Sequence, residues 1–233
     1  MIDENFDLEV VRSLSYHYTN DKLVYIKDEL LNTNIFELEY NGHNPISLNN
    51  NDITYEGRRI KTFGNNTYFY NEEGIRVKKI TSLGNTHEYV LEGNKILSEK
   101  IYNTSNNTLL AELNYNYDIK GELVSAEYND KLYFYIKDIL GNIIKIVDKD
   151  GTDVVKYYYN SFGVVTSNII SVNEDDCTFV QYNPFIYKGY YYDKETNLYY
   201  LNSRFYSPEL CRFITVDDYS YLDSESLNIF KNI

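Results

Sequence analysis

One sequence pattern is repeated six times between residues 55 and 163: aromatic residues, a short polar stretch, a glycine and then a run of residues that favour β-strands. The clearest copies occupy residues 68–77, 115–124 and 157–165, and residues 133–143 hold a longer variant. The glycines of successive copies are 17, 19, 28, 20 and 22 residues apart, which is the length of two strands with their turns. A regular internal period of this size is typical of repeat architectures. The repeats therefore predict a series of hairpins, and they indicate a structural rather than a catalytic role.

Composition favours strands over helices. Tyrosine occurs 27 times, alanine only twice, and tryptophan is absent. Tyrosine suits a pleated, half-buried surface, whereas alanine is the strongest helix former. Dipeptides that favour hairpin turns, such as Asn41-Gly42 and Asp150-Gly151, separate the β-prone runs. We therefore predict an all-β fold, an antiparallel meander of hairpins that curls into a trough, a spiral or a barrel because strands twist in one sense.

The charge and hydropathy of the chain exclude several classes of partner. The formal net charge of −13 favours solubility and argues against nucleic acid or an anionic membrane. No stretch approaches the roughly 20 apolar residues that a transmembrane helix needs. Residues 1–7 are acidic where a signal peptide is basic, and no apolar region follows them. We expect neither a membrane span nor a signal peptide in this sequence.

The order of patterns along the chain predicts a single repeat domain over residues 1–233. Residues 1–13 form an N-terminal arm, and residues 14–165 carry the hairpin repeats, beginning with a hairpin over residues 15–26. Residues 166–182 are acidic and lack the repeat, so we expect a long surface connection there. Residues 183–233 form a C-terminal part whose sequence differs from that of the repeats.

The sequence of this C-terminal part resembles that of a known family. Residues 183–201 read NPFIYKGYYYDKETNLYYL, and residues 204–214 read RFYSPELCRFI. This sequence closely resembles the RHS-repeat-associated core of bacterial RHS/YD-repeat proteins, and the upstream repeats match the family pattern Y-x-Y-D-x-x-G. The resemblance covers about residues 50–228.

The resemblance implies a role as well as a fold. Members of this family wind a long sheet into a hollow cocoon around a toxic C-terminal domain, and they serve in toxin delivery, bacterial competition or wall association. It implies a secreted or cell-surface location and, as partners, other shell segments or a toxin domain. Family members are often cleaved by an aspartate-dependent reaction at a D-P-x-G motif, which these 233 residues do not contain. We expect a non-enzymatic shell segment without a cofactor.

Two residues depart from the family pattern at glycine positions. Asn197 replaces the first glycine, and asparagine tolerates a left-handed backbone. Cys211 replaces the second, where a left-handed conformation is harder to accommodate. The two cysteines, Cys177 and Cys211, are expected to be free thiols rather than a disulfide framework.

Few residues are candidates for catalysis or metal binding. The family's core ends near an arginine and an aspartate, and the residues of this chain beside those positions are Arg212, Asp217 and Asp218. They are the weak candidates for an aspartate-dependent self-processing reaction, which ranks third among the functions considered, after the shell segment and carbohydrate binding. Residues 148–153 do not match a calcium-binding loop and are expected to form a hairpin turn. The three histidines are too scattered for a zinc site, so no metal is expected.

Two surfaces leave an alternative open. If the tyrosines are exposed, their rings could stack on sugar rings, and the chain would be a carbohydrate-binding surface module. If the rings are buried, the tyrosines have a structural role in the core. The candidate stacking residues are Tyr190, Tyr191, Tyr192, Tyr199 and Tyr200. A basic stretch is expected to be a solvated sheet face, with an acidic glycan or a phosphate group as the other possibility. Its residues are Arg58, Arg59, Lys61, Arg76, Lys78 and Lys79.

Overall fold

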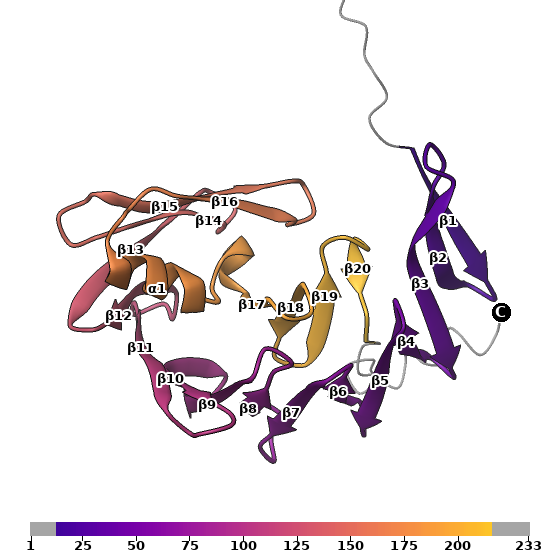
Figure 1. The fold of residues 1–233 in the computed structure, drawn as a ribbon, viewed down its shortest axis with the longest axis horizontal. Helices are drawn as coiled ribbons and strands as arrows, with labels where there is room; N and C mark the ends of the chain where they lie inside the picture. Colours follow the sequence, from indigo (N-terminus) through magenta and orange to yellow (C-terminus); the bar gives the residue numbers. More distant parts are fainter. Residues whose placement is uncertain (1–12, 216–233) are drawn as a thin grey trace, which may run out of the picture. The chain divides into compact units, whose positions relative to one another are not determined.

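The structure, a computed structural model, describes residues 13–215 (Figure 1). The chain divides into two compact units, Met1–Thr54 and Tyr55–Ile233. The expected arm at residues 1–13 lies outside the described residues except for Ser13. A single repeat domain over the whole chain stays a prediction, and the two units are described separately.

Sixteen strands follow one another in sheet order as they do in the sequence, which confirms the predicted meander. Neighbouring strands pair antiparallel, as the registers of β1 with β2 and of β15 with β16 show. The first strands are β1 (Leu14–Thr19), β2 (Lys22–Asp28), β3 (Thr33–Asn41), β4 (Asn44–Leu48) and β5 (Asn51–Glu56). The strands of the second unit that follow are β6 (Arg59–Phe63), β7 (Asn66–Tyr70), β8 (Arg76–Ile80), β9 (Asn85–Glu92), β10 (Lys95–Asn103), β11 (Leu109–Tyr117), β12 (Leu123–Tyr128), β13 (Lys131–Lys137), β14 (Ile143–Val147), β15 (Asp153–Tyr159) and β16 (Val165–Ile169).

The first unit begins with the hairpin that the sequence predicted. Strands β1 and β2 are joined by Asn20 and Asp21, and both residues have positive φ angles, of 49° and 62°. This is the conformation that two-residue hairpin turns require, and asparagine and aspartate adopt it at low cost. The buried apolar residues of this unit include Leu23, Ile26 and Leu38.

In the second unit, the residues of the repeated pattern form the turns between strands. The Asp or Asn after the aromatic residues accepts hydrogen bonds from backbone N–H groups two and four residues later, as Asp118 does from Lys120 and Glu122. The glycine three residues after it, Gly121, has a φ of +81°. The tyrosine before Asp118, Tyr117, donates its hydroxyl to the carbonyl of Ile96 at 2.9 Å. This repeat thus closes its own turn and is bonded to the preceding strand, and Tyr70 and Tyr159 make the same kind of bond, to the carbonyls of Ile60 and Ile143.

This turn chemistry makes a testable prediction. Asp118→Ala removes the acceptor for two backbone N–H groups, so the thermal midpoint Tm should fall by a few degrees. Asp118→Asn keeps an acceptor oxygen and should stay close to wild type, because Asn160 makes the same contacts in another repeat. Differential scanning fluorimetry of the two variants measures the difference. Equal Tm losses for both would mean that charge, not the acceptor geometry, matters at this position.

The residues after β16 form a C-terminal segment, defined here as residues 174–215. It consists of α1 (Glu174–Tyr182), the 3-10 turn η1 (Tyr187–Gly189) and a second antiparallel sheet. The strands of that sheet are β17 (Tyr191–Asp193), β18 (Leu198–Leu201), β19 (Arg204–Ser207) and β20 (Arg212–Phe213). No helix among residues 13–215 is both long and apolar enough to cross a membrane.

Residues 166–182 differ from the expected surface connection. They contain strand β16 and helix α1, whose N-terminus is capped by Asn173. Phe179 of the helix is fully buried and stacks on Tyr133 with a centroid distance of 3.9 Å. Asp176 accepts a hydrogen bond from the Tyr133 hydroxyl at 2.8 Å. The acidic residues that suggested a loop occupy the first turn of the helix, where negative charge is favourable.

The C-terminal segment packs against one face of the sheet in the second unit (Figure 1). Its side chains and backbone contact nine consecutive strands, from β7 to β15. The contacts, in strand order, are Tyr68 with Phe205, Arg76 with Asp193, Tyr89 with Tyr191, Glu99 with Tyr191, Tyr115 with Phe185, Tyr128 and Tyr133 with Phe179, Ile143 with Ile186, and Tyr159 with Tyr187. The segment is therefore an internal brace for the repeats.

Both departures from the glycine pattern lie in the left-handed region. Asn197 has a φ of 57° and Cys211 a φ of 56°. Asparagine adopts this conformation readily, whereas for other residues it costs about 1–2 kcal/mol. Both cysteines are free, so no disulfide offsets this strain.

We therefore expect Cys211→Gly to stabilise the protein by about 1 kcal/mol, because glycine has no Cβ to be strained. Urea denaturation measures the change. Asn197→Gly is the matched control and should change stability by less than about 0.5 kcal/mol. A Cys211→Gly variant less stable than wild type would show that the packing of the thiol outweighs the backbone strain.

Candidate functional site: a buried charge cluster

A bulge in strand β8 places two cationic residues on the same face of the sheet. Lys79 pairs with Tyr68 of β7 and Arg76 pairs with Tyr70, so Val77 is an extra residue without a partner. Tyr68 and Tyr70 are two residues apart and point to the same face, and their partners Arg76 and Lys79 therefore do so as well. In a regular strand, residues three apart would point to opposite faces.

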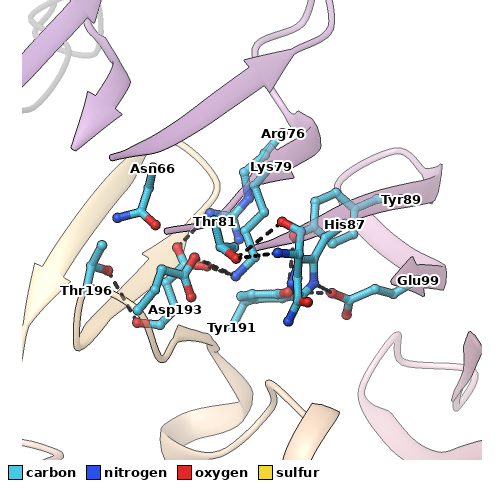
Figure 2. Close-up of polar contacts among 12 residues, drawn as sticks. Asn66, Arg76, Lys79, Thr81, His87, Tyr89, Glu99, Tyr191, Asp193 and Thr196 are labelled. Carbon is cyan, nitrogen blue, oxygen red and sulfur yellow. Dashed lines mark hydrogen bonds and ion pairs between the residues drawn. The ribbon is translucent and has the colours of Figure 1, made fainter. Parts of the chain in front are cut away.

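Both cations contact a single carboxylate of the C-terminal segment (Figure 2). Asp193 of β17 accepts a hydrogen bond from Nη1 of Arg76 at 2.6 Å and another from Nζ of Lys79 at 2.8 Å. Lys79 also bonds Glu195 at 2.8 Å. Arg76, Lys79 and Asp193 are 1%, 2% and 0% exposed. The cluster contains two positive and two negative groups, so its net charge is zero.

The charges within the cluster stabilise one another. Burial alone would raise the pKa of Asp193, but the charges of Arg76 and Lys79 outweigh this and lower it. Burial opposes the charged form of Lys79 too, and the charges of Asp193 and Glu195 raise its pKa nevertheless. Removal of one partner would therefore leave a buried charge uncompensated.

Arg76 is also surrounded by aromatic rings. Its guanidinium carbon lies 4.2 Å from the ring centroid of Tyr200 and 4.8 Å from that of Tyr191. Tyr68 and Tyr89 lie at 5.4 Å and 5.5 Å. Cation–π attraction of this kind strengthens when the cation is desolvated. The tyrosines around Arg76 thus act as a cage for a cation.

A second buried network adjoins this cluster. Glu99 of β10 lies 2.7 Å from Nδ1 of His87 and accepts hydrogen bonds from the hydroxyls of Tyr191 at 2.6 Å and Tyr115 at 3.1 Å. Tyr89 donates its hydroxyl to that of Tyr191 at 3.1 Å. Figure 2 shows Tyr191 between the two networks. An ionised carboxylate can only accept, so Nδ1 of His87 carries the proton that this contact needs.

The pKa shifts favour a neutral histidine beside an ionised glutamate. Burial and the charge of Lys79 lower the pKa of His87, although Glu99 acts in the opposite direction. Burial would raise the pKa of Glu99, but the hydrogen bonds of His87 and Tyr191 and the charge of Lys79 lower it. Both groups therefore bind protons less readily in the folded state than in the unfolded one. Acid should destabilise the fold through both residues.

The His87 contribution to stability is present above the unfolded pKa of 6.5 and decreases as the pH falls below that value. Wild type should lose stability between about pH 7 and about pH 5, with a slope from this residue of at most about 1.4 kcal/mol per pH unit. His87→Gln does not titrate and should show a smaller slope, as measured from urea midpoints. His43→Gln, at an exposed position, should keep the wild-type slope. Identical slopes in all three proteins would contradict the prediction.

The predicted stacking surface must be corrected for three of its five tyrosines. Tyr191, Tyr199 and Tyr200 are 4%, 0% and 6% exposed, so their rings cannot present a face to a sugar. Their hydroxyls bond Glu99, the carbonyl of Gly163 and the backbone N–H of Arg76. Tyr190 and Tyr192 are half-buried, and sugar binding at these two stays a prediction.

The catalytic candidates are not brought together among the described residues. Arg212 is half-buried in β20, while Asp217 and Asp218 lie outside the described residues. No group of three or more metal-ligating side chains occurs within residues 13–215. Residues 148–152 form the turn between β14 and β15, where Asp148 accepts a hydrogen bond from the backbone N–H of Thr152, and Asp153 is the first residue of β15.

The basic stretch is not a uniform solvated face. The side chain of Lys78 is 37% exposed and pairs with Glu88, but Arg76 and Lys79 are buried in the cluster, and the prediction is wrong for these two. The sequence did hold a signal for their partners, because Asp193 and Glu195 lie within residues 183–201, the stretch that resembles the core of the family. The bulge that turns Arg76 inward could not be predicted from the sequence.

The fold and this cluster define a class of protein, a braced segment of YD repeats. Residues 65–231 match the family model described as Teneurin YD-shell. The chain belongs to the Teneurin YD-shell family.

Relatives with curated names are similar over part of their length. The tRNA3(Ser)-specific nuclease WapA of Bacillus spizizenii is 34% identical over 162 residues, which is 70% of this chain and 6% of that protein. The tRNA nuclease WapA of Bacillus subtilis is 35% identical with the same coverage. The chain thus spans only a small part of these relatives, and their named activities are statements about them.

Solved structures share the fold at low sequence identity. The crystal structure of TcdB2-TccC3-TEV matches with a TM-score of 0.62 and 15% identity, over 93% of this chain and 12% of that one. The structure of TcdB2-TccC3 without its hypervariable C-terminal region matches with a TM-score of 0.64 and 14% identity, at the same coverage. These likenesses concern the fold alone.

Proposed function

We propose that this chain is a non-enzymatic part of the wall of a YD-repeat shell, that its sheet curls around the C-terminal segment, and that the shell encloses a toxic domain used in bacterial competition. The partners would be other shell segments or the enclosed domain. Family membership supports the shell role, and the brace across nine strands supports the curl.

One observation carries the proposed curl. Tyr199 and Tyr200 are adjacent in β18, yet Tyr199 donates to the carbonyl of Gly163, in the turn after β15, and the hydroxyl of Tyr200 accepts from the N–H of Arg76 in β8. In a flat sheet, β8 and β15 would be about 34 Å apart, because neighbouring strands are spaced by about 4.8 Å. Two neighbouring side chains cannot span that distance, so this pair of contacts supports a bend in the sheet between β8 and β15.

A chimera with a relative tests the shell role. The 162-residue stretch of the Bacillus subtilis WapA that matches this chain would be replaced by the corresponding residues of this chain. A wall segment should leave the resistance of the whole protein to limited proteolysis close to that of the parent. The same chimera with Asp193→Ala should lose this resistance, because its brace is weakened.

The outcomes separate shell from other roles. A chimera that is degraded as fast as the parent with the stretch deleted would refute the proposal. The alternative of self-processing is tested on the chain itself by mass spectrometry after incubation for days. Loss of intact mass that Asp217→Asn or Asp218→Asn abolishes would favour an enzyme instead.

A further inference from the structure

A cavity of about 540 Å³ lies in the second unit beside the charge cluster. On one side it is lined by residues of the sheet and its turns, among them Lys95, Gly121 and Lys137. On the other side it is lined by the C-terminal segment, including Lys188 and Tyr190. Its volume is within the range of small-molecule sites, about 300–1,000 Å³.

The charged residues that line this cavity are mostly positive. They are Arg76, Lys95, Lys137 and Lys188 against a single carboxylate, Glu122. The chain as a whole carries a net charge of −13. A concentration of positive charge in a concave site within an acidic protein attracts anions selectively.

Two of these lysines have no acidic partner within residues 13–215. Lys137 lies 3.5 Å from Glu122, but Lys95 and Lys188 form no ion pair among the described residues. Their ammonium groups lie only near rings, Lys95 at 5.5 Å from the Tyr117 centroid and Lys188 at 5.7 Å from that of Tyr187. Both are thus free to bind an anion.

The backbone holds these two lysines in unusual places. A Cβ atom at Gly121 would come within 2.5 Å of Nζ of Lys95, so the glycine leaves room for the ammonium group over the turn. Lys188 has a φ of 53°, a left-handed conformation that a long side chain adopts at a cost. Strain of this kind is concentrated at binding sites.

The guanidinium of Arg76, which lies at one side of the cavity, is enclosed by the protein. Only Nη1 bonds Asp193, while Nε and Nη2 are buried and have no hydrogen-bond partner among the described residues. Aromatic rings face the guanidinium and reduce the cost of this arrangement. An anion in the cavity therefore meets the ammonium groups of Lys95 and Lys188 rather than these enclosed donors of Arg76.

We propose that this cavity binds a small organic anion through its carboxylate or phosphate group. Lys95 and Lys188 contact the anion, and Tyr190 and Leu201 contact the uncharged part of the ligand. The site is distinct from the shell role proposed above and does not depend on it.

Isothermal titration calorimetry of the full chain at about 0.15 M NaCl tests the proposal. The probes are inorganic phosphate, glucose 6-phosphate and glucuronate, with glucose as the neutral control. We expect 1:1 binding of at least one anionic probe and none of glucose. The two sugar anions differ in their charged group, so their relative affinities tell phosphate from carboxylate. Higher salt should weaken the binding.

Variants locate the binding in the cavity. The double variant Lys95→Gln with Lys188→Gln should weaken binding by about tenfold or more, since it removes two charge-assisted contacts. Lys120→Gln removes an equal charge from an exposed turn position outside the cavity lining and should stay within about twofold of wild type. If the double variant does not fold, as judged by circular dichroism, Lys188→Gln alone serves, because Lys188 is exposed.

Three results would overturn the proposal. The first is no binding of any anionic probe, and the second is equal binding of glucose. The third is an affinity of the lysine variants equal to that of wild type, which would place the anion elsewhere on the chain.

Discussion

Asp193→Ala is expected to lower the free energy of unfolding by about 3–5 kcal/mol, the usual cost of removing one partner from a buried ion pair. The variant leaves Arg76 and Lys79 buried with Glu195 as their remaining carboxylate, so one positive charge is uncompensated. For a chain of this length, each kcal/mol corresponds to about 2–4 °C in Tm. Thermal and urea denaturation should both register the loss.

The matched control is an ion pair between β8 and β9. Glu88 pairs with Lys78 at 2.9 Å, but both side chains are exposed. Glu88→Ala should therefore cost at most about 1 kcal/mol. A loss for Asp193→Ala no larger than that for Glu88→Ala would mean that the buried cluster is hydrated or rearranges, and the brace would have to rest on aromatic packing alone.

Tyr199→Ala is the second large expected effect, also about 3–5 kcal/mol, because it empties a fully buried aromatic site. The ring contacts those of Tyr192 and Tyr187 at centroid distances of 4.9 Å and 5.7 Å. Its hydroxyl donates to the carbonyl of Gly163 at 2.8 Å. Tyr199→Phe keeps the ring and should cost only about 0.5–1.5 kcal/mol, the value of one hydrogen bond.

Tyr158→Ala is the control for this variant. Tyr158 is 58% exposed, and its truncation should change stability by less than about 0.5 kcal/mol. Chemical denaturation of the three variants gives the comparison. Similar small losses for Tyr199→Ala and Tyr158→Ala would indicate that the C-terminal segment detaches from the sheet in solution, and sugar stacking by its tyrosines would regain support.

The hairpin repeats were predictable because their signals are local. A tyrosine pair, an aspartate or asparagine and a glycine three residues later specify one turn with its backbone hydrogen bonds, as at Asp118 and Gly121. The left-handed backbone at Asn197 and Cys211 could likewise be anticipated from two glycine positions of the core motif.

The candidate site was less accessible to sequence reasoning because it is made by distant contacts. Arg76 and Asp193 are 117 residues apart, and a one-residue bulge decides whether Arg76 faces inward or outward. Helix α1 was missed for a related reason. Its acidic first turn has the composition of a loop, and the burial of Phe179 depends on Tyr133, which lies in a different repeat.

The brace sets a limit on how this protein can change in length during evolution. Turns and hydroxyl contacts such as that of Tyr117 with Ile96 connect a repeat to its neighbour, so by themselves they would permit a hairpin to be duplicated or lost. Between β7 and β15, however, each strand faces a particular residue of the C-terminal segment. A hairpin inserted there would move Tyr89 away from Tyr191 and Arg76 away from Asp193 together. Changes in repeat number should therefore accumulate before β7, while the braced strands keep a constant count.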